Sequence, residues 1–248
     1  MFDTALPAES ARSHLAPAAL RIVDAVLDAL SDRNLPAGGK LGEELLARLF
    51  ETSRTTVRQA LQHLRFLGIV EIEPNRGASI ARPTARMAAD LYAARRAIES
   101  QTVADAARYC TANDMRTMLA HIERQDAAAA AKNRRELVRL RGEFHLVIAE
   151  IGGNAVLCHL LGQILPRCAL IRALADPQPF TKRQIDEHRM LAQLIAKGDA
   201  KKATALVQSH LQINEQQLRF SGDDQARANN VDVWLGAYAR PHPAERKA

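Results

Sequence analysis

The chain has 248 residues, a formal net charge of +6, and 47% hydrophobic and 25% charged residues. This is the length of two domains that each bury a core, with the composition of an ordinary soluble protein, and the 4% of aromatic residues favours helices over sheets. We expect neither a signal peptide nor a membrane span. The N-terminus has no basic region followed by an apolar run, and no segment approaches about 18 uninterrupted apolar residues.

Three helices are predicted in the first third of the chain. Apolar residues at helical spacing indicate helices over residues 18–30 and 43–50. The third helix begins after Ser53, whose hydroxyl can accept a hydrogen bond from the first turn. It ends near Gly68, because glycine readily takes the left-handed conformation that follows a helix end.

A β-hairpin is predicted directly after the third helix. Residues 69–73 and 78–81 read as its strands, and Pro74-Asn-Arg-Gly77 between them is typical of a turn. Three helices followed by a two-stranded wing predict a winged helix-turn-helix over residues 16–82. In that fold, the wing can bring Arg76 to the minor groove or to a phosphate of DNA.

The third helix has a basic face opposite its apolar face. At roughly 100° per residue, Arg54, Arg58 and Arg65 share a side with Thr55, and no acid lies among them. Arginine suits phosphate oxygens and the O6/N7 edge of guanine, so we interpret this face as a DNA-reading surface. The alternative is a solvated surface helix. The chain through Pro83 holds ten Lys and Arg against ten Asp and Glu, so any basic footprint is local.

The remainder of the chain shows only helical periodicity. Helices are expected over residues 85–109, 113–131, 134–151, 155–175, 181–196 and 200–220. The fold class is therefore mainly α, with a C-terminal antiparallel helical bundle over residues 83–222. A flexible arm at residues 1–15 and a polar tail at 223–248, with a short helix from Val231, complete the expected organisation.

Three histidines of the bundle form a candidate site. His188 lies ten residues before Gly198 and His210 twelve after it. In an antiparallel hairpin both are roughly 15–18 Å from the turn, so they can lie side by side. His145, from a separate helix, would complete a site for Zn²⁺, Ni²⁺ or Mn²⁺ with open coordination positions. The alternative is three unrelated histidines.

The first domain resembles the DNA-binding domain of GntR-type bacterial transcription regulators. The resemblance rests on Leu41-Gly-Glu-Glu-Leu-Leu-Ala47, Thr52-Ser-Arg-Thr-Thr-Val-Arg-Gln-Ala-Leu61, Gly68-Ile-Val70 and Pro74-Asn-Arg-Gly77. It covers about residues 17–82. It implies that the operator is contacted by the helix residues Arg54, Thr55, Thr56 and Arg58 and by the wing residues Asn75, Arg76 and Gly77.

The second domain resembles the all-helical effector domain, of the FCD type, found in the FadR subfamily of the same family. The residues that carry this resemblance are Arg95-Arg-Ala-Ile-Glu99, Gly142-Glu-Phe-His145, Gly153-Asn154, Asp186-Glu-His188, Gly198-Asp199 and His210-Leu211. It implies a metal bound by the three histidines and a small carboxylate effector whose site includes Arg95, Glu99 and Asn154. It also implies a homodimer, and a twofold dimer would bind a palindromic double-stranded operator.

Two positions depart from the pattern of the family. Glu44 stands where an arginine is common, so it either turns away from DNA or the docking differs. Arg141 stands where many members carry an aspartate that binds the metal, and a guanidinium cannot be a ligand. Either the metal remains on three histidines with Arg141 turned toward an anionic effector, or the metal is absent and Arg141 forms a carboxylate clamp with Arg95.

We therefore predict a ligand-controlled transcription regulator, not an enzyme. The competing class is a metalloenzyme that uses the three histidines, but its candidate base, Glu143, is about 200° around the helix from His145. A third hypothesis is an interaction module that has lost DNA binding. Three cysteines without CxxC spacing suggest reduced thiols and a cytoplasmic protein.

Overall fold

The computed structural model describes residues 14–175, 182–220 and 231–239. These residues form two compact units, one built mainly from residues 14–83 and the other mainly from residues 84–169 and 182–219. Most of the expected arm at residues 1–15, and most of the expected tail at 223–248, lies outside the described residues.

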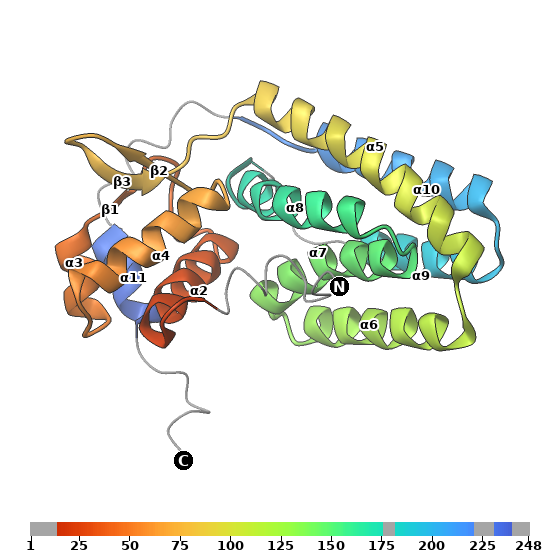
Figure 1. Cartoon of the computed structure of the whole chain (residues 1–248), viewed down its shortest axis with the longest axis horizontal. Coiled ribbons are helices and arrows are strands. Elements are labelled where there is room, and N and C mark those ends of the chain that lie inside the picture. Colours follow the sequence, from red (N-terminus) through yellow and green to blue (C-terminus); the bar gives the residue numbers. More distant parts are fainter. Residues whose placement is uncertain (1–13, 176–181, 221–230, 240–248) are drawn as a thin grey trace, which may run out of the picture. The chain divides into compact units, whose positions relative to one another are not determined.

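The first unit is a winged helix-turn-helix (Figure 1). Its elements are α2 (Pro17–Ser31), β1 (Lys40–Leu41), α3 (Glu43–Leu49), α4 (Arg54–Phe66), β2 (Val70–Glu73) and β3 (Gly77–Ile80). Helix α4 begins as predicted, because the Ser53 hydroxyl accepts a hydrogen bond from the Thr56 backbone N–H at 3.1 Å. Gly68 follows the end of α4 with a φ of 72°, the left-handed conformation expected there.

The wing contains one strand more than predicted. Strands β2 and β3 form the expected antiparallel hairpin, and β1 pairs with the other edge of β3 in the order β1-β3-β2. The two-stranded prediction was therefore incomplete. A strand of two residues, Lys40–Leu41, is too short to show an alternating pattern, and only its pairing with Ser79 and Ala78 defines it.

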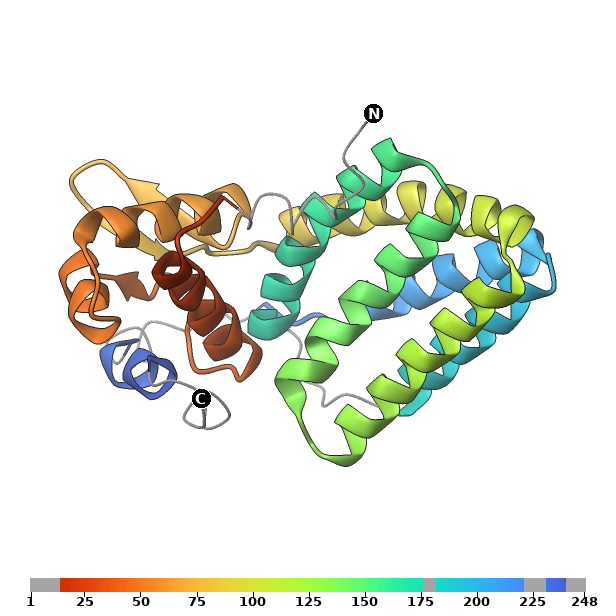
Figure 2. The same cartoon turned by 60° about the horizontal axis from the view of Figure 1, so that its bottom comes forward.

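The second unit is a bundle of helices. They are α5 (Ala85–Tyr109), α6 (Ala112–Ala130), α7 (Arg134–Ile151), α8 (Ala155–Ala175), α9 (Lys182–Ala196) and α10 (Ala200–Gln216). Helix α5 lies along α10, and α6 packs against α7 and α9 (Figure 2). Side-chain caps fix several starts; Thr111 and Asp114, for example, form a reciprocal capping box at α6. Helix α10 ends at Gln216, four residues earlier than expected.

A short helix from the C-terminal region belongs to the first unit. Helix α11 (Val231–Tyr238) packs against α2, and Leu235 is completely buried in the core of that unit. The hydroxyl of Tyr238 donates to Asp32 and accepts from Asn34, both at 2.7 Å. The short helix expected from Val231 therefore contributes to the core of the winged helix-turn-helix unit.

Helix α8 is unusual among the described helices. It alone is long and apolar enough to meet the criteria for a membrane span, yet it includes Pro166, Arg167 and Arg172. One side of it packs on α7, through a cluster that contains Ala149, Cys158, Leu161 and Leu165. Its opposite side carries exposed apolar residues, and no described residue covers Val156, which is 68% exposed.

Candidate functional site

The predicted DNA-reading residues of α4 lie on its solvent face. Arg54, Thr55 and Arg58 are exposed, while the apolar residues of the same helix face the core. Thr56 is half-buried, and its hydroxyl lies 2.9 Å from that of Ser53. Thr56 therefore takes part in the N-cap as well as bordering the reading face.

The three predicted wing residues are exposed at the tip of the β2–β3 turn. Asn75 and Gly77 both have positive φ, 62° and 79°, which is what the turn requires. Arg76 points away from the sheet core, and its Nη1 lies 3.3 Å from Glu73 of the same hairpin. The structure thus places a single arginine at the outermost part of the wing.

Glu44 does not turn away from the reading face. Its carboxylate lies 3.4 Å from Nη2 of Arg54, and the neighbouring Glu43 contacts Nε of Arg58 at 2.8 and 3.0 Å. Two of the arginines predicted to contact DNA are therefore paired with acids of α3. The sequence led us to expect that Glu44 affects how the protein docks on DNA. It did not identify Arg54 as the partner of Glu44 or Arg58 as the partner of Glu43.

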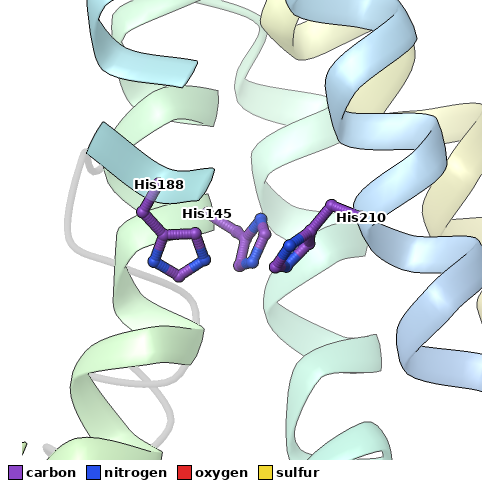
Figure 3. A group of neighbouring side chains, drawn as sticks. All are labelled: His145, His188 and His210. Atoms are coloured by element: carbon purple, nitrogen blue, oxygen red, sulfur yellow. The ribbon is translucent and has the colours of Figure 1, made fainter. Parts of the chain in front are cut away.

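The three predicted histidines meet in the interior of the helical bundle. His145 comes from α7, His188 from α9 and His210 from α10, and their rings face a common centre (Figure 3). One ring nitrogen from each lies within 4.8 Å of the others, and all three side chains are buried. The hairpin geometry that paired His188 with His210 was correct, since their ring centroids are 5.1 Å apart.

Each of these histidines is oriented by an oxygen at its Nδ1 atom. The partners are Glu99 Oε2 for His145 at 2.7 Å, Gln125 Oε1 for His188 at 2.9 Å and Glu187 Oε2 for His210 at 2.7 Å. Carboxylate and amide oxygens only accept, so the Nδ1 atoms of His188 and His210 carry the hydrogen and their Nε2 atoms keep a lone pair. Proteins use this arrangement to orient histidines that bind metals.

The Nε2 atoms have different surroundings. His210 Nε2 accepts from the Asn214 side-chain amide at 3.0 Å, and Asn214 in turn accepts from Gln184 at 3.1 Å. His188 Nε2 is buried and has no hydrogen-bond partner among the described residues. A buried lone pair without a donor is unfavourable unless a ligand meets it, so the donor set fits a divalent metal.

Burial lowers the pKa of all three histidines. The shift is largest for His188 and His210, and the nearby charge of Arg141 adds to it for each ring. For His145, burial is the largest influence, and Glu99 opposes it. The rings are therefore neutral near pH 7, which is the form that binds metal.

Glu99 is the acid at the centre of this network. It is 1% exposed, and besides His145 it contacts Nε of Arg95 at 2.6 Å. Burial alone would raise its pKa, but Arg95 and His145 outweigh burial and hold the pKa at about 2. Arg95, predicted to face an effector, is thus engaged by Glu99, although its Nη2 remains buried without a hydrogen-bond partner among the described residues.

Arg141 lies one turn before His145 on α7, is 7% exposed, and lines a pocket of about 230 Å³ between α6, α7 and α9. Lys182 and Gln184 are among the other lining residues. Asp126 also lines it, but its carboxylate pairs with Arg189. The lining surface is mainly apolar, with Leu137 and Ile185 among its residues, and it carries two cations, Arg141 and Lys182, beside the histidine cluster.

Two further candidates lie apart from the cluster. Asn154, expected in the effector site, is exposed and caps α8, where its Oδ1 accepts from the backbone of Val156 and Leu157 at 3.1 Å. Glu143 pairs with Arg139 and lies 3.8 Å from His121. As the helical angle predicted, it does not join the three histidines.

Sequence reasoning missed the residues that support the cluster. Gln125, Glu187 and Asn214 were not singled out, yet each contacts a ring nitrogen of a histidine. For Gln125 and Asn214 a signal was present, because polar residues that prove to be buried recur in pairs four positions apart, on one face of a helix. These pairs are Arg95/Glu99, His121/Gln125, Arg141/His145, Gln184/His188 and His210/Asn214.

Comparisons with known proteins agree with both halves of the chain. Residues 18–80 match the model of bacterial regulatory proteins of the gntR family, and residues 90–213 match the FCD domain. The Uxu operon transcriptional regulator of Escherichia coli is 26% identical over 220 residues, which span 79% of this chain and 82% of that protein. The transcriptional repressor NanR of Cronobacter sakazakii is 29% identical over 192 residues, which span 68% and 72%.

Solved structures show the same fold. A GntR-type structure from Rhodococcus sp. RHA1 has a TM-score of 0.69 at 24% identity and covers 80% of this chain and 96% of its own. McbR/YncC of Escherichia coli has a TM-score of 0.68 at 20% identity and covers 82% and 99%.

A winged helix-turn-helix joined to a helical domain with a buried polar centre, in a chain that matches regulators along both halves, defines the class as DNA-binding transcription regulators. The chain belongs to the gntR family of bacterial regulatory proteins and carries an FCD domain. The predicted fold class and family are thereby confirmed, and the metalloenzyme alternative finds no support. The narrower assignment to the FadR subfamily stays a prediction.

Proposed function

We propose that this regulator binds a palindromic operator as a homodimer and responds to a small carboxylate held in its helical domain. The observation that carries the proposal is the convergence of three neutral, buried imidazoles beside the buried cation Arg141. Desolvating several titratable side chains together is costly, and such a cluster is typical of a functional site.

On DNA, α4 enters the major groove and presents Arg54, Thr55 and Arg58 to the operator. The exposed position of these side chains on one face of α4 supports this docking. Asn75, Arg76 and Gly77 of the wing contact the backbone or the adjacent minor groove. The reading is sequence-specific if Arg58 pairs with a guanine edge.

A divalent metal, Zn²⁺, Ni²⁺ or Mn²⁺, would be held by one ring nitrogen each of His145, His188 and His210, with Asn214 giving up its hydrogen bond to His210 Nε2. The ion would supply open coordination positions for an effector carboxylate. Arg141 stands near these ligands in place of an aspartate, so it opposes the charge of the metal and lowers its affinity. The same guanidinium favours an anion bound alongside the metal.

The pocket beside Arg141 suits a small organic acid. Its volume of about 230 Å³ accommodates several non-hydrogen atoms, since a water occupies about 30 Å³. Arg141 and Lys182 supply positive charge for a carboxylate, and Gln184 supplies an amide. In a site without metal, Arg141 would be the principal anchor and Arg95, through its buried Nη2, a second one.

The exposed side of α8 is the proposed dimer surface. Val156 and Leu160, one turn apart, are 68% and 41% exposed on a helix that is apolar on nearly all sides. An apolar helix face is unfavourable in water, and a second copy of the chain would bury it. The same contact would provide the twofold symmetry that a palindromic operator requires. We also propose a cytoplasmic location and no catalytic role.

The test combines metal and carboxylate titrations of the full-length protein after treatment with a chelator. Zn²⁺, Ni²⁺ and Mn²⁺ are added to wild type, His188→Ala and His159→Ala, the last removing an exposed histidine of α8 outside the cluster. Binding by wild type and His159→Ala but not by His188→Ala is expected. Small mono- and dicarboxylates are then screened by thermal shift, with and without metal. A melting temperature unchanged by every metal and acid would overturn the proposed effector site.

A further inference from the structure

Two neighbouring glutamates at the start of α3 contact different arginines of α4. Glu43 contacts Arg58, and Glu44 contacts Arg54. All four side chains are substantially exposed, so neither pair is a buried structural ion pair. Pairs of this kind contribute little to stability, and their position on the reading face calls for another explanation.

The two contacts use different atoms of the guanidinium groups. Both oxygens of Glu43 accept from Nε of Arg58, at 3.0 and 2.8 Å. This leaves Nη1 and Nη2 of Arg58, the two nitrogens at the end of the side chain, to meet O6 and N7 of a guanine. Glu43 therefore holds Arg58 through Nε and does not compete with the base for Nη1 and Nη2.

Glu44 has the opposite geometry. It lies 3.4 Å from Nη2 of Arg54, a terminal nitrogen that a DNA phosphate or base would otherwise meet. A carboxylate at that nitrogen competes with DNA and repels a nearby phosphate. Nη2 of Arg54 can contact DNA only after this pair has separated.

The net charge of the whole region makes this competition important for DNA affinity. The chain through Pro83 holds equal numbers of basic and acidic residues, so attraction to DNA depends on a few arginines. Sequence-independent affinity comes mainly from such phosphate contacts. The pairing of Arg54 with Glu44 therefore reduces affinity for all duplexes, whereas the pairing of Arg58 with Glu43 improves affinity for the correct duplex.

We propose that Glu43 is a positioning residue that directs Arg58 toward a guanine, whereas Glu44 restrains Arg54 and lowers sequence-independent DNA affinity. Glu43 thereby raises the ratio of specific to non-specific binding, and Glu44 lowers the affinity for every duplex. This inference rests on the docking of α4 given under the proposed function.

The experiment measures DNA affinity across a salt series with full-length protein. The probes are a duplex that the wild-type protein selects from a random library and a shuffled duplex of the same length. Glu44→Gln is expected to tighten binding to both duplexes by about twofold to fivefold. It should also steepen the salt dependence by about one unit of slope, because Arg54 becomes available to a phosphate. Glu71→Gln, which removes the same charge from β2, is the control and should leave the slope unchanged.

Glu43→Gln is expected to lower the ratio of selected to shuffled affinity by about twofold to fivefold. The loss should vanish in the Arg58→Ala background, and it should vanish when 7-deazaguanine replaces the guanine that Arg58 reads. A loss caused by a general folding defect would persist in both cases. The melting temperatures of the variants provide an independent check of folding.

Four results would overturn the inference. Equal tightening by Glu43→Gln and Glu44→Gln would show that only net charge matters. An effect of Glu43→Gln that persists without Arg58 would exclude the positioning role. If Arg58→Ala weakens binding normally while both glutamine variants behave as wild type, this inference fails and the proposed docking stands; if Arg58→Ala has no effect, both fail.

Discussion

Oε2 of Glu99 lies 2.7 Å from Nδ1 of His145, and both groups are buried. The other oxygen of the carboxylate contacts Arg95, so one acid orients a histidine of the candidate metal site and neutralises a buried cation. The Arg95–Glu99 pair has an exposed counterpart on the same helix, Arg86 and Asp90, with the same spacing of four residues. The two pairs allow a controlled comparison.

Glu99→Gln should destabilise the helical domain by about 3–5 kcal/mol, because it leaves the charge of Arg95 buried without compensation. Asp90→Asn, at the exposed pair, should cost less than about 1 kcal/mol. Chemical denaturation of both variants and wild type measures the difference. Equal effects of the two substitutions would contradict the central role of Glu99.

Arg141→Asp should tighten metal binding by about 10-fold or more, a change comparable to those seen when groups around metal ligands are altered. It should also weaken the response to a carboxylate effector, because an anion replaces a cationic anchor. Arg139→Asp makes the same change of charge at an exposed position of α7 and is the control. Metal titration and effector-induced thermal shift are the two measurements. If metal binds but the response to effector is unchanged in Arg141→Asp, the anchor role is wrong.

Arg58→Ala should weaken operator binding by about 1–3 kcal/mol and relax selectivity at one base position. Arg76→Ala, at the wing, should weaken binding with less dependence on sequence. Binding isotherms on the selected and shuffled duplexes separate these effects. Equal operator affinity of Arg58→Ala and wild type across the salt series would exclude the proposed docking.

Leu160→Glu should convert a dimer into a monomer, because a carboxylate would be buried in the proposed apolar interface on α8. Met190→Glu, at a position 52% exposed on α9, introduces the same side chain elsewhere and should leave the dimer intact. Analytical ultracentrifugation measures both. A wild-type monomer on and off DNA, or a dimer that Leu160→Glu does not affect, would count against this surface.

The stability of the metal-free protein should fall as the pH decreases from about 7.5 to 5.5. The pKa values of His145, His188 and His210 are lowered in the folded state, chiefly by burial. Below the unfolded value of about 6.5, the unfolded chain therefore binds more protons and is favoured. Each histidine can contribute up to about 1.4 kcal/mol per pH unit.

Urea denaturation at several pH values, in the presence of a chelator, measures this dependence. His188→Gln should make it shallower, whereas His159→Gln, at an exposed position of α8, should leave it unchanged. If the stability of wild type does not change with pH, the pKa values of the three histidines are not lowered in the folded protein.

The sequence alone determined the features of this protein that depend on local periodicity. Helical periodicity of apolar residues placed α4, with Arg54 and Arg58 on its outer face, and similar distances from Gly198, ten and twelve residues, placed His188 beside His210. Turn and cap residues set most helix ends, because those interactions form within a few residues. A two-residue strand such as β1 has no such local signal.

The tertiary structure decided which polar groups meet across helices. That Glu99 reaches His145, that Gln125 and Glu187 orient His188 and His210, and that Glu44 reaches Arg54 follows from how the helices pack. Spacing in the sequence gives the angle of a side chain around its own helix but not the stagger or rotation of a neighbouring helix. A hydrogen bond between helices requires positions accurate to a fraction of an ångström, and only packing of the whole core sets them.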